Sequence, residues 1–466
     1  MQRFDRAAFL RSLASTAAVA SAAAPRGARA AEERPAPDAV AEAVRREFVH
    51  GYEGYKRAAW GRDEVLPVSG GASDFFVPGH TFGLSIIEAL DTLYVMELDE
   101  DLAAGVAWLR ANLTFDIDGE MQVFEAIIRM VGGLLAGYAA TNEAFLLERA
   151  RDLADRLLPA FARSPTGAPF RYVNLRTGAV REPHSNLAEI GSNVLEFGEL
   201  SRLTGNPAYR DASRAAYRAA IDRRSALGLL GTDFDVETGQ WIGDVSVAPN
   251  PPVDSFYEYL WGGYRLFGDE ELRGWYRLLT DAILAHQTDR TTGSLWFRHV
   301  DFRSGKPAEQ TQSELAAFYA GLLAKGGDRD AGAAYFDTWT TVARRYRLPP
   351  EELDYGAATV TDPRYWLRPE YANSAFDLWR LTHDDRYRAA AYDHFLALRE
   401  HCRVAGGYTV VLDVRATPMT HGDLTPAYWF AENMKYLYLM FATAPRFDDA
   451  TAYLSTEGKI LRGLRR

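Results

Sequence analysis

Carboxylates among large apolar neighbours are the residues of this 466-residue chain most suited to chemistry. Glu125 follows Phe124 and precedes Ile128, and Arg129 comes one helical turn later. Such neighbours exclude water from a carboxyl group, and a desolvated carboxylic acid suits general-acid catalysis. The same spacing also fits a plain i,i+4 ion pair with Arg129, and the segment alone leaves both interpretations open.

A second carboxylate, Asp254, comes where a loop passes into a helix. Two prolines precede it, and Ser255 and Glu258 after it have the spacing of a helix capping box. We expect the capping residues to have a structural role. Asp254 then stands at the end of the loop and points out of the helix.

Three further positions have both a structural and a chemical interpretation. Glu370 follows a proline at another predicted helix start, where its charge favours the helix dipole. Glu432 and Lys435 lie in the last predicted helix with the spacing of a simple surface ion pair. Thr456 lies in a short segment that fits a hairpin strand, where it serves equally well as a turn residue.

Together these positions indicate a sugar site. Aromatic residues make up 12% of the chain, and aromatic rings stack on sugar faces while carboxylates bind hydroxyl groups and act as acid and base. We find no phosphate-binding loop, no dinucleotide glycine motif, no H-E-x-x-H and no G-x-S-x-G, and the nine histidines are scattered. The residues by themselves therefore indicate a glycosidase or a sugar-binding protein.

Charge and cysteine content exclude other classes. The formal net charge of −11 disfavours a nucleic-acid partner, because such a surface repels phosphates. A single cysteine, Cys402, rules out an internal disulfide and a cysteine-rich metal site. Any metal would have oxygen or histidine ligands. With 47% apolar residues the chain can bury a large core.

The first thirty residues have the pattern of an export signal. Arg3, Arg6 and Arg11 precede an alanine-rich stretch over 13–24, and Ala28-Arg29-Ala30 resembles a cleavage site. A low-complexity tail is the alternative. We expect residues 1–30 to be removed and residues 31–466 to form the mature protein, periplasmic or secreted. No later run of 18 uninterrupted apolar residues predicts a membrane span.

Helices must position these side chains, because apolar residues recur at i, i+3, i+4 and i+7 through most of the mature chain. The predicted helices cover 38–59, 81–98, 100–113, 121–140, 143–162, 185–205, 207–223, 254–268, 270–287, 311–325, 330–346, 368–382, 385–401 and 426–442. Tight turns join consecutive pairs, which predicts seven helical hairpins in one all-α domain over residues 31–466. Long loops between the hairpins are where binding residues are expected.

At these positions the chain resembles glycoside hydrolase family 47, the class I α-1,2-mannosidases. The matching segments include 83–93, Phe124-Glu125 through Arg129, 187–197, 254–260, Arg368-Pro369-Glu370, Glu432 with 435–438, and Ser455-Thr456-Glu457. The resemblance implies an (α/α)7 barrel of seven hairpins, plugged at one end by a C-terminal β-hairpin that carries Thr456. It also implies an exo-acting, inverting hydrolase of terminal α-1,2-linked mannose that uses one Ca²⁺.

The resemblance further implies the role of each site residue. Glu125 is the general acid, Glu370 the general base and Asp254 a third essential carboxylate. Thr456 is the direct ligand of Ca²⁺, while Glu189, Glu370 and Glu432 hold the waters of the ion and the hydroxyls of the sugar. The implied substrate-binding residues are Arg129, Glu189, Arg368, Phe430 and Glu432. The implied partner is a mannose-containing oligosaccharide, and no segment indicates a protein partner.

Three positions depart from the pattern of the family. Asn373 stands where many relatives have a second glutamate, Glu314 where they often have histidine, and Pro252 at a position that selects mannose isomers. The natural substrate and the branch preference stay open for this reason. Two alternatives also stay open: an inactive mannose-binding lectin on the same barrel, and a six-hairpin (α/α)6 toroid with another carbohydrate substrate.

Overall fold

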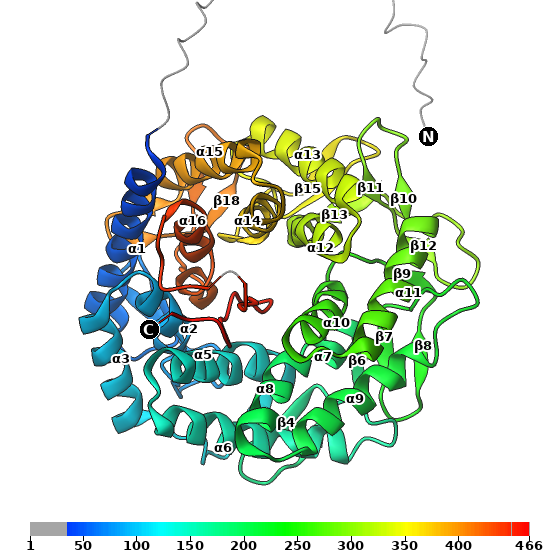
Figure 1. The fold of residues 1–466 in the computed structure, drawn as a ribbon, viewed down its shortest axis with the longest axis horizontal. Helices are drawn as coiled ribbons and strands as arrows, with labels where there is room; N and C mark the ends of the chain where they lie inside the picture. The colour runs from blue at the N-terminus through cyan, green and yellow to red at the C-terminus, as the bar shows by residue number, and fades with distance from the viewer. Residues whose placement is uncertain (1–34, 449, 466) are drawn as a thin grey trace, which may run out of the picture. The chain divides into compact units, whose positions relative to one another are not determined.

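The computed structural model describes residues 35–448 and 450–465, which belong almost entirely to one compact unit, Pro37–Arg466. The predicted export signal at residues 1–30 lies outside these ranges. Within the unit, helices form two concentric rings around a common axis (Figure 1). The predicted all-α barrel is confirmed.

Each outer helix packs against an inner one. The outer helices are α1 (Pro37–Ala59), α3 (Asp99–Asn112), α6 (Ala144–Ala162), α9 (Ala208–Ile221), α11 (Glu270–His286), α13 (Arg329–Tyr346) and α15 (Asp385–His401). The inner helices are α2 (Leu84–Val95), α5 (Gly132–Thr141), α8 (Val194–Thr204), α10 (Asp254–Phe267), α12 (Tyr319–Gly326), α14 (Glu370–Thr382) and α16 (Asn433–Phe441). Six pairs follow in sequence from α2 with α3 to α14 with α15, and α16 closes the ring against α1. The seven pairs are the expected (α/α)7 barrel, and the six-hairpin alternative is wrong.

The two rings differ in composition because the inner helices are covered on both sides. Every residue of α2 is buried, whereas α1 alternates buried apolar residues with exposed charges. The stretch Val123–Thr141 is long and apolar enough to cross a membrane by composition, but 78% of it is buried inside the protein. It is therefore a core helix of the inner ring.

Several inner helices begin with short irregular segments that helical periodicity did not separate. The predicted helix at 121–140 is β3 (Glu120–Gln122), α4 (Val123–Glu125), the π-helical turn η1 (Ala126–Val131) and α5. The helix expected from 185 is β6 (His184–Asn186), α7 (Leu187–Gly191) and then α8. The segments at 311 and 426 likewise begin as β13 (Thr311–Ser313) with the 3₁₀ turn η2 (Glu314–Phe318), and as the 3₁₀ turn η3 (Ala427–Phe430).

Short antiparallel strands directly precede three of these starts, at 123, 187 and 314. The three-stranded sheets join β3 to β4 (Tyr172–Asn174) and β5 (Val180–Arg181), β6 to β7 (Asp233–Asp235) and β8 (Gln240–Ile242), and β13 to β14 (Glu352–Asp354) and β15 (Thr359–Asp362). In each sheet the first strand leads directly into an inner helix. Asn186 and Ser313 then cap the new turns through the backbone N–H groups of Glu189 and Leu315. The residues after these strands consequently lie at one end of the barrel.

The other strands form two-stranded ladders in the loops. They are β1 (Glu64–Leu66) with β2 (Gly71–Ser73), β9 (Val245–Ser246) with β12 (Val300–Asp301), β10 (Thr288–Asp289) with β11 (Trp296–Phe297), β16 (Arg403–Val404) with β17 (Gly407–Tyr408), and β18 (Val411–Asp413) with β19 (Thr420–His421).

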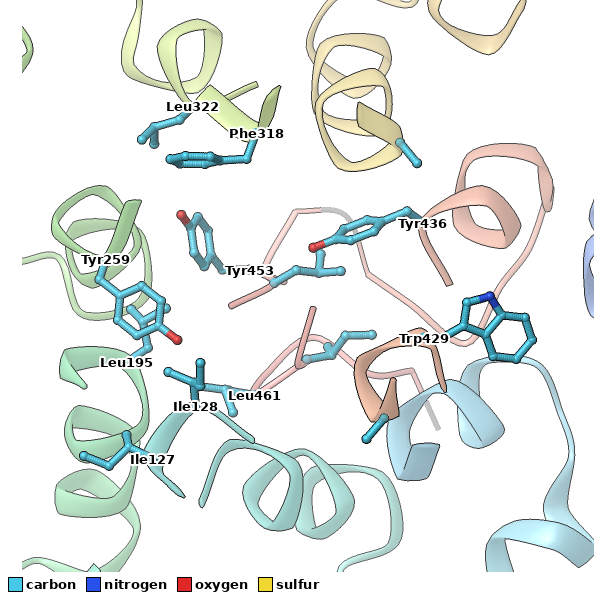
Figure 2. Close-up of a cluster of buried hydrophobic side chains, with 14 of the residues drawn as sticks. Ile127, Ile128, Leu195, Tyr259, Phe318, Leu322, Trp429, Tyr436, Tyr453 and Leu461 are labelled. Atoms are coloured by element: carbon cyan, nitrogen blue, oxygen red, sulfur yellow. The ribbon is translucent and has the colours of Figure 1, made fainter. Parts of the chain in front are cut away.

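The C-terminal segment enters the ring of inner helices. Tyr453 and Leu461 lie among apolar side chains of the inner ring, including Ile128, Tyr259 and Tyr436 (Figure 2). The predicted β-hairpin is here a tight turn, in which the Gly458 N–H donates to the Ser455 carbonyl at 2.8 Å. One bridge, between Leu454 and Ile460, flanks this turn. The turn carries Thr456 into the barrel.

Candidate active site

A cavity of about 300 Å³ lies where the inner helices begin. Its acidic lining residues come from different elements, among them α4, α7, α10, α14 and the start of α16. Eight of the nine residues predicted for the site line it: Glu125, Arg129, Glu189, Asp254, Arg368, Glu370, Glu432 and Thr456. The barrel thus brings together residues that are up to 331 positions apart in the sequence, as between Glu125 and Thr456.

Glu125 and Arg129 form the ion pair that their spacing allows. Arg129 Nε donates to Glu125 Oε2 at 2.6 Å, and the Glu125 side chain keeps 21% of its exposure. The desolvation expected of Glu125 is therefore only partial. Arg129 lies in the π-helical turn η1, a form of helix that is frequent at functional sites.

Arg129 also ties the cavity to the C-terminal segment. Its Nη1 donates to Glu457 Oε2 at 2.6 Å and lies 3.5 Å from Glu88 Oε1. Burial would lower the pKa of this guanidinium, but Glu125, Glu457 and Glu88 hold it well above its ordinary value. Arg129 is consequently charged, and it holds Glu125 in place beside the turn that carries Thr456.

Glu370 begins α14 and points into the cavity. Burial raises its pKa to about 7, although the neighbouring Arg368 favours the ionised form. Arg368 is in turn held by Glu351, whose Oε1 accepts from Nε at 2.7 Å. A carboxyl group that titrates near neutral pH is suited to take up and release a proton.

Asp254 opens α10, as predicted, but the capping box is absent. Its Oδ1 accepts a hydrogen bond of 2.9 Å from the Ser255 N–H, and burial raises its pKa against the effect of Arg368. Ser255 Oγ instead accepts a hydrogen bond of 2.7 Å from Ser192 Oγ. Glu258 accepts one from the side chain of Thr456, and burial raises its pKa to about 7. Tertiary partners therefore replace the local cap.

Glu189, which also lines the cavity, is held by three donors. Gln122 Nε2, Arg171 Nε and Ser185 Oγ donate to its carboxylate at 2.9, 2.7 and 3.0 Å. These contacts fix a buried carboxylate in one orientation, because each of its oxygens has a partner.

The prediction of a surface ion pair between Glu432 and Lys435 is wrong. Both residues are buried, and Lys435 Nζ donates to Asp91 Oδ2 at 2.7 Å instead. Glu432 turns into the cavity, where burial and then the carboxylates of Glu457 and Glu370 raise its pKa well above its ordinary value. Inside the ring of helices, every residue of α16 except Tyr438 is buried.

Phe430 does not line the cavity. It is fully buried in an aromatic cluster, with ring centroids 5.8 Å from Tyr52 and 5.6 Å from Tyr55. Tyr428, which the sequence interpretation missed, lines the cavity, and the Arg129 guanidinium lies 5.6 Å from its ring centroid. The sequence signal that could have identified Tyr428 is its position four residues before Glu432. The Glu432 N–H donates to the Tyr428 carbonyl at 2.9 Å. Two aromatic residues that are two positions apart therefore lie in different surroundings: Tyr428 lines the cavity and Phe430 belongs to the core.

The donor set fits a hard cation. The seven acidic lining residues are Glu125, Glu189, Asp254, Glu258, Glu370, Glu432 and Glu457, against two basic ones, Arg129 and Arg368. Oxygen donors in such an excess of negative charge are what Ca²⁺ prefers. Among the described residues, no three His, Cys, Asp or Glu side chains are grouped as direct ligands. Thr456 lines the same cavity as these carboxylates.

The comparisons with known proteins point to one family. The model of glycosyl hydrolase family 47 matches residues 47–463. Mannosyl-oligosaccharide 1,2-alpha-mannosidase IB of Mus musculus is 34% identical over 84% of this chain, which spans 65% of that relative's length. Alpha-mannosidase I MNS5 of Arabidopsis thaliana is 35% identical over 86% of this chain and 73% of its own.

The fold comparison agrees. The structure of the alpha-1,2-mannosidase from Trichoderma reesei covers 92% of this chain and 100% of its own, with a TM-score of 0.83 and 26% identity. The range matched by the family model, 47–463, includes every inner helix that contributes to the cavity. The chain belongs to glycosyl hydrolase family 47.

Proposed function

We propose that this protein is an exo-acting, inverting α-1,2-mannosidase that removes terminal α-1,2-linked mannose from oligosaccharides. The observation that carries the proposal is the convergence of Glu125, Asp254 and Glu370 on one cavity from three different inner helices. The cavity, about 300 Å³, has the size of a small-molecule site. The relative from Mus musculus is named a mannosyl-oligosaccharide 1,2-alpha-mannosidase, which supports the same substrate class here.

In this proposal the two catalytic carboxyls have separate tasks. Glu125 donates a proton to the oxygen of the leaving sugar, and Arg129 keeps the carboxyl oriented for it. Glu370 takes the proton of a water that attacks from the opposite face of the ring. Inversion needs roughly 6.5–9.5 Å between the two carboxyls, so that this water fits between them. Asp254 is the third carboxylate of the site.

The proposal includes one Ca²⁺ held by Thr456. When bound, this ion neutralises part of the negative charge in the cavity and orients sugar hydroxyls. Glu189 and Glu432 hold its waters, and their fixed or buried carboxylates are suited to this. Arg129, Arg368 and Tyr428 are the proposed sugar contacts from the protein.

The test is hydrolysis of α-1,2-mannobiose by the purified chain, followed by proton NMR, with and without a calcium chelator. We expect β-mannose to appear first, to cease on chelation and to return on addition of Ca²⁺. Release of α-mannose first would contradict the roles of Glu125 and Glu370. Binding of the disaccharide without release would instead support a mannose-binding lectin.

The export signal remains part of the proposal. We propose that the protein is periplasmic or secreted and that its substrates are mannosides outside the cytoplasm. Cell fractionation followed by N-terminal sequencing of the purified protein tests this. A cytoplasmic protein that retains residues 1–30 would contradict it.

A further inference from the structure

A buried carboxyl group beside Glu370 has no role in the mechanism above. Glu314, the first residue of η2, is completely buried. Neither of its carboxyl oxygens has an ordinary hydrogen-bond donor, and Oε2 of Glu370 lacks one as well. Three buried oxygens without a donor are costly, because each has lost its water.

The carboxyl groups of Glu314 and Glu370 are neighbours, and a hydrogen bond between them would satisfy both side chains. Such a bond between two carboxyls requires a proton, since two carboxylates only accept. η2 is fixed against α14 at this point, where Ser374 Oγ donates to the Ala317 carbonyl at 2.6 Å and accepts from the Gly321 N–H at 2.9 Å.

The surroundings decide which carboxyl keeps the proton. Glu370 has Arg368 and the backbone N–H groups at the start of α14 on its side, and these favour its ionised form. No cation pairs with Glu314 in the described part of the chain, because the nearby Arg368 forms its ion pair with Glu351. Burial and the neighbouring Glu370 raise the pKa of Glu314 well above its ordinary value.

The other titratable groups that influence the pair leave this assignment unchanged. They are Glu351, Arg368, Tyr335, Tyr365, Tyr428, Glu432 and Tyr436. The only cation among them is Arg368, and the tyrosines are neutral.

We propose that Glu314 is a positioning residue: as a neutral carboxylic acid it donates a hydrogen bond to the carboxylate of Glu370 and holds it in the orientation of a base. This inference rests on the proposed function, in which Glu370 activates water. It gives a role to one of the positions at which this chain departs from its relatives. The proton stays on Glu314, and no bond to it is broken in the reaction.

Two matched variants test the proposal on α-1,2-mannobiose. Glu314→Gln keeps a neutral donor of nearly the same shape, so we expect kcat within about threefold of the unsubstituted protein. Glu314→Leu removes the donor, so we expect kcat to fall about 10- to 100-fold with KM within about twofold. The acid limb of its kcat profile should move to higher pH, because Glu370 then loses a donor to its ionised form.

Equal losses in Glu314→Gln and Glu314→Leu would overturn the proposal, since they would require an ionised or proton-transferring Glu314. Full activity in Glu314→Leu would overturn it too. The infrared difference spectrum at neutral pH gives an independent result. We expect the carbonyl band of a protonated carboxylic acid in the unsubstituted protein to be missing from Glu314→Gln, and an unchanged band intensity would contradict the proposal.

These outcomes differ from failure of the proposed function. If the unsubstituted protein releases no mannose, the mannosidase proposal fails, while the infrared comparison still decides whether Glu314 holds a proton. If it releases mannose but both variants behave alike, only the positioning role fails.

Discussion

Replacing Lys459 with methionine tests how the C-terminal segment is held inside the ring. Lys459 and Glu88 form an ion pair with both side chains fully buried. Lys459 Nζ also donates to the Glu88 carbonyl at 3.2 Å, while Arg129 approaches Glu88 only to 3.5 Å. The variant therefore leaves a buried carboxylate with one long contact to a cation.

Breaking one side of a buried ion pair costs about 3–5 kcal/mol of unfolding free energy, because the remaining charge has no compensation. With a dependence on urea of about 3 kcal/mol per molar, the unfolding midpoint falls by about 1–1.7 M. Equilibrium unfolding in urea, followed by the fluorescence of the ten tryptophans, measures this shift.

Two controls separate the buried charge from a general loss of contacts. Arg415→Met removes an exposed pair with Asp413, so we expect a change of only about 0–1 kcal/mol. The double variant Lys459→Met with Glu88→Gln should recover most of the loss, since it leaves no buried carboxylate at that position. The reasoning is refuted if Lys459→Met unfolds like Arg415→Met, or if the double variant is no more stable than Lys459→Met.

Three further predictions concern buried acids and the cavity wall. Burial raises the pKa of Glu196 from 4.5 to about 8. The unfolding free energy should therefore fall as pH rises from 4.5 to 8, and it should fall less in Glu196→Gln. Urea titrations across that pH range measure both. Tyr428→Ala should raise KM for α-1,2-mannobiose about tenfold, whereas Phe430→Ala should cost about 3–5 kcal/mol in urea unfolding and leave KM unchanged. Glu125→Gln and Glu370→Gln should each lower kcat about 10²- to 10⁴-fold in steady-state assays.

Each of these has a contrary outcome. Parallel pH profiles for Glu196→Gln and the unsubstituted protein would show that this carboxyl is not protonated in the folded chain. If KM rose in Phe430→Ala and stayed unchanged in Tyr428→Ala, Phe430 and not Tyr428 would be the residue that contacts the substrate. A Glu370→Gln variant with full kcat would exclude Glu370 as the base.

The sequence was a reliable guide wherever a property repeats along the chain. The 3.6-residue apolar periodicity located every outer helix within about three residues, because an outer helix has one face toward the protein and one toward water. It placed the starts of several inner helices too early. There the chain forms a strand or a 3₁₀ turn before the helix, as at Thr311–Ser313 and Glu314–Phe318, and pairing with distant strands decides the boundary.

The sequence by itself also determined the types of residue in the site. Carboxylates at loop-to-helix junctions and their motif context identified eight residues that line the cavity. The five carboxylates among them lie near the starts of inner helices, and the C-terminal turn brings Thr456 to the same place.

Only the tertiary structure decided their partners. Glu432 and Lys435 have the spacing of a surface ion pair, but the ring of helices buries both side chains, and Lys435 pairs with Asp91 instead. Phe430 and Tyr428 are two residues apart and face different surroundings. The contact of Glu314 with Glu370 joins η2 to α14 across 56 residues of sequence. The physical reason is common to all three: burial removes water from charged and polar groups, so each must find a partner, and the partner is whichever group the closed ring brings near.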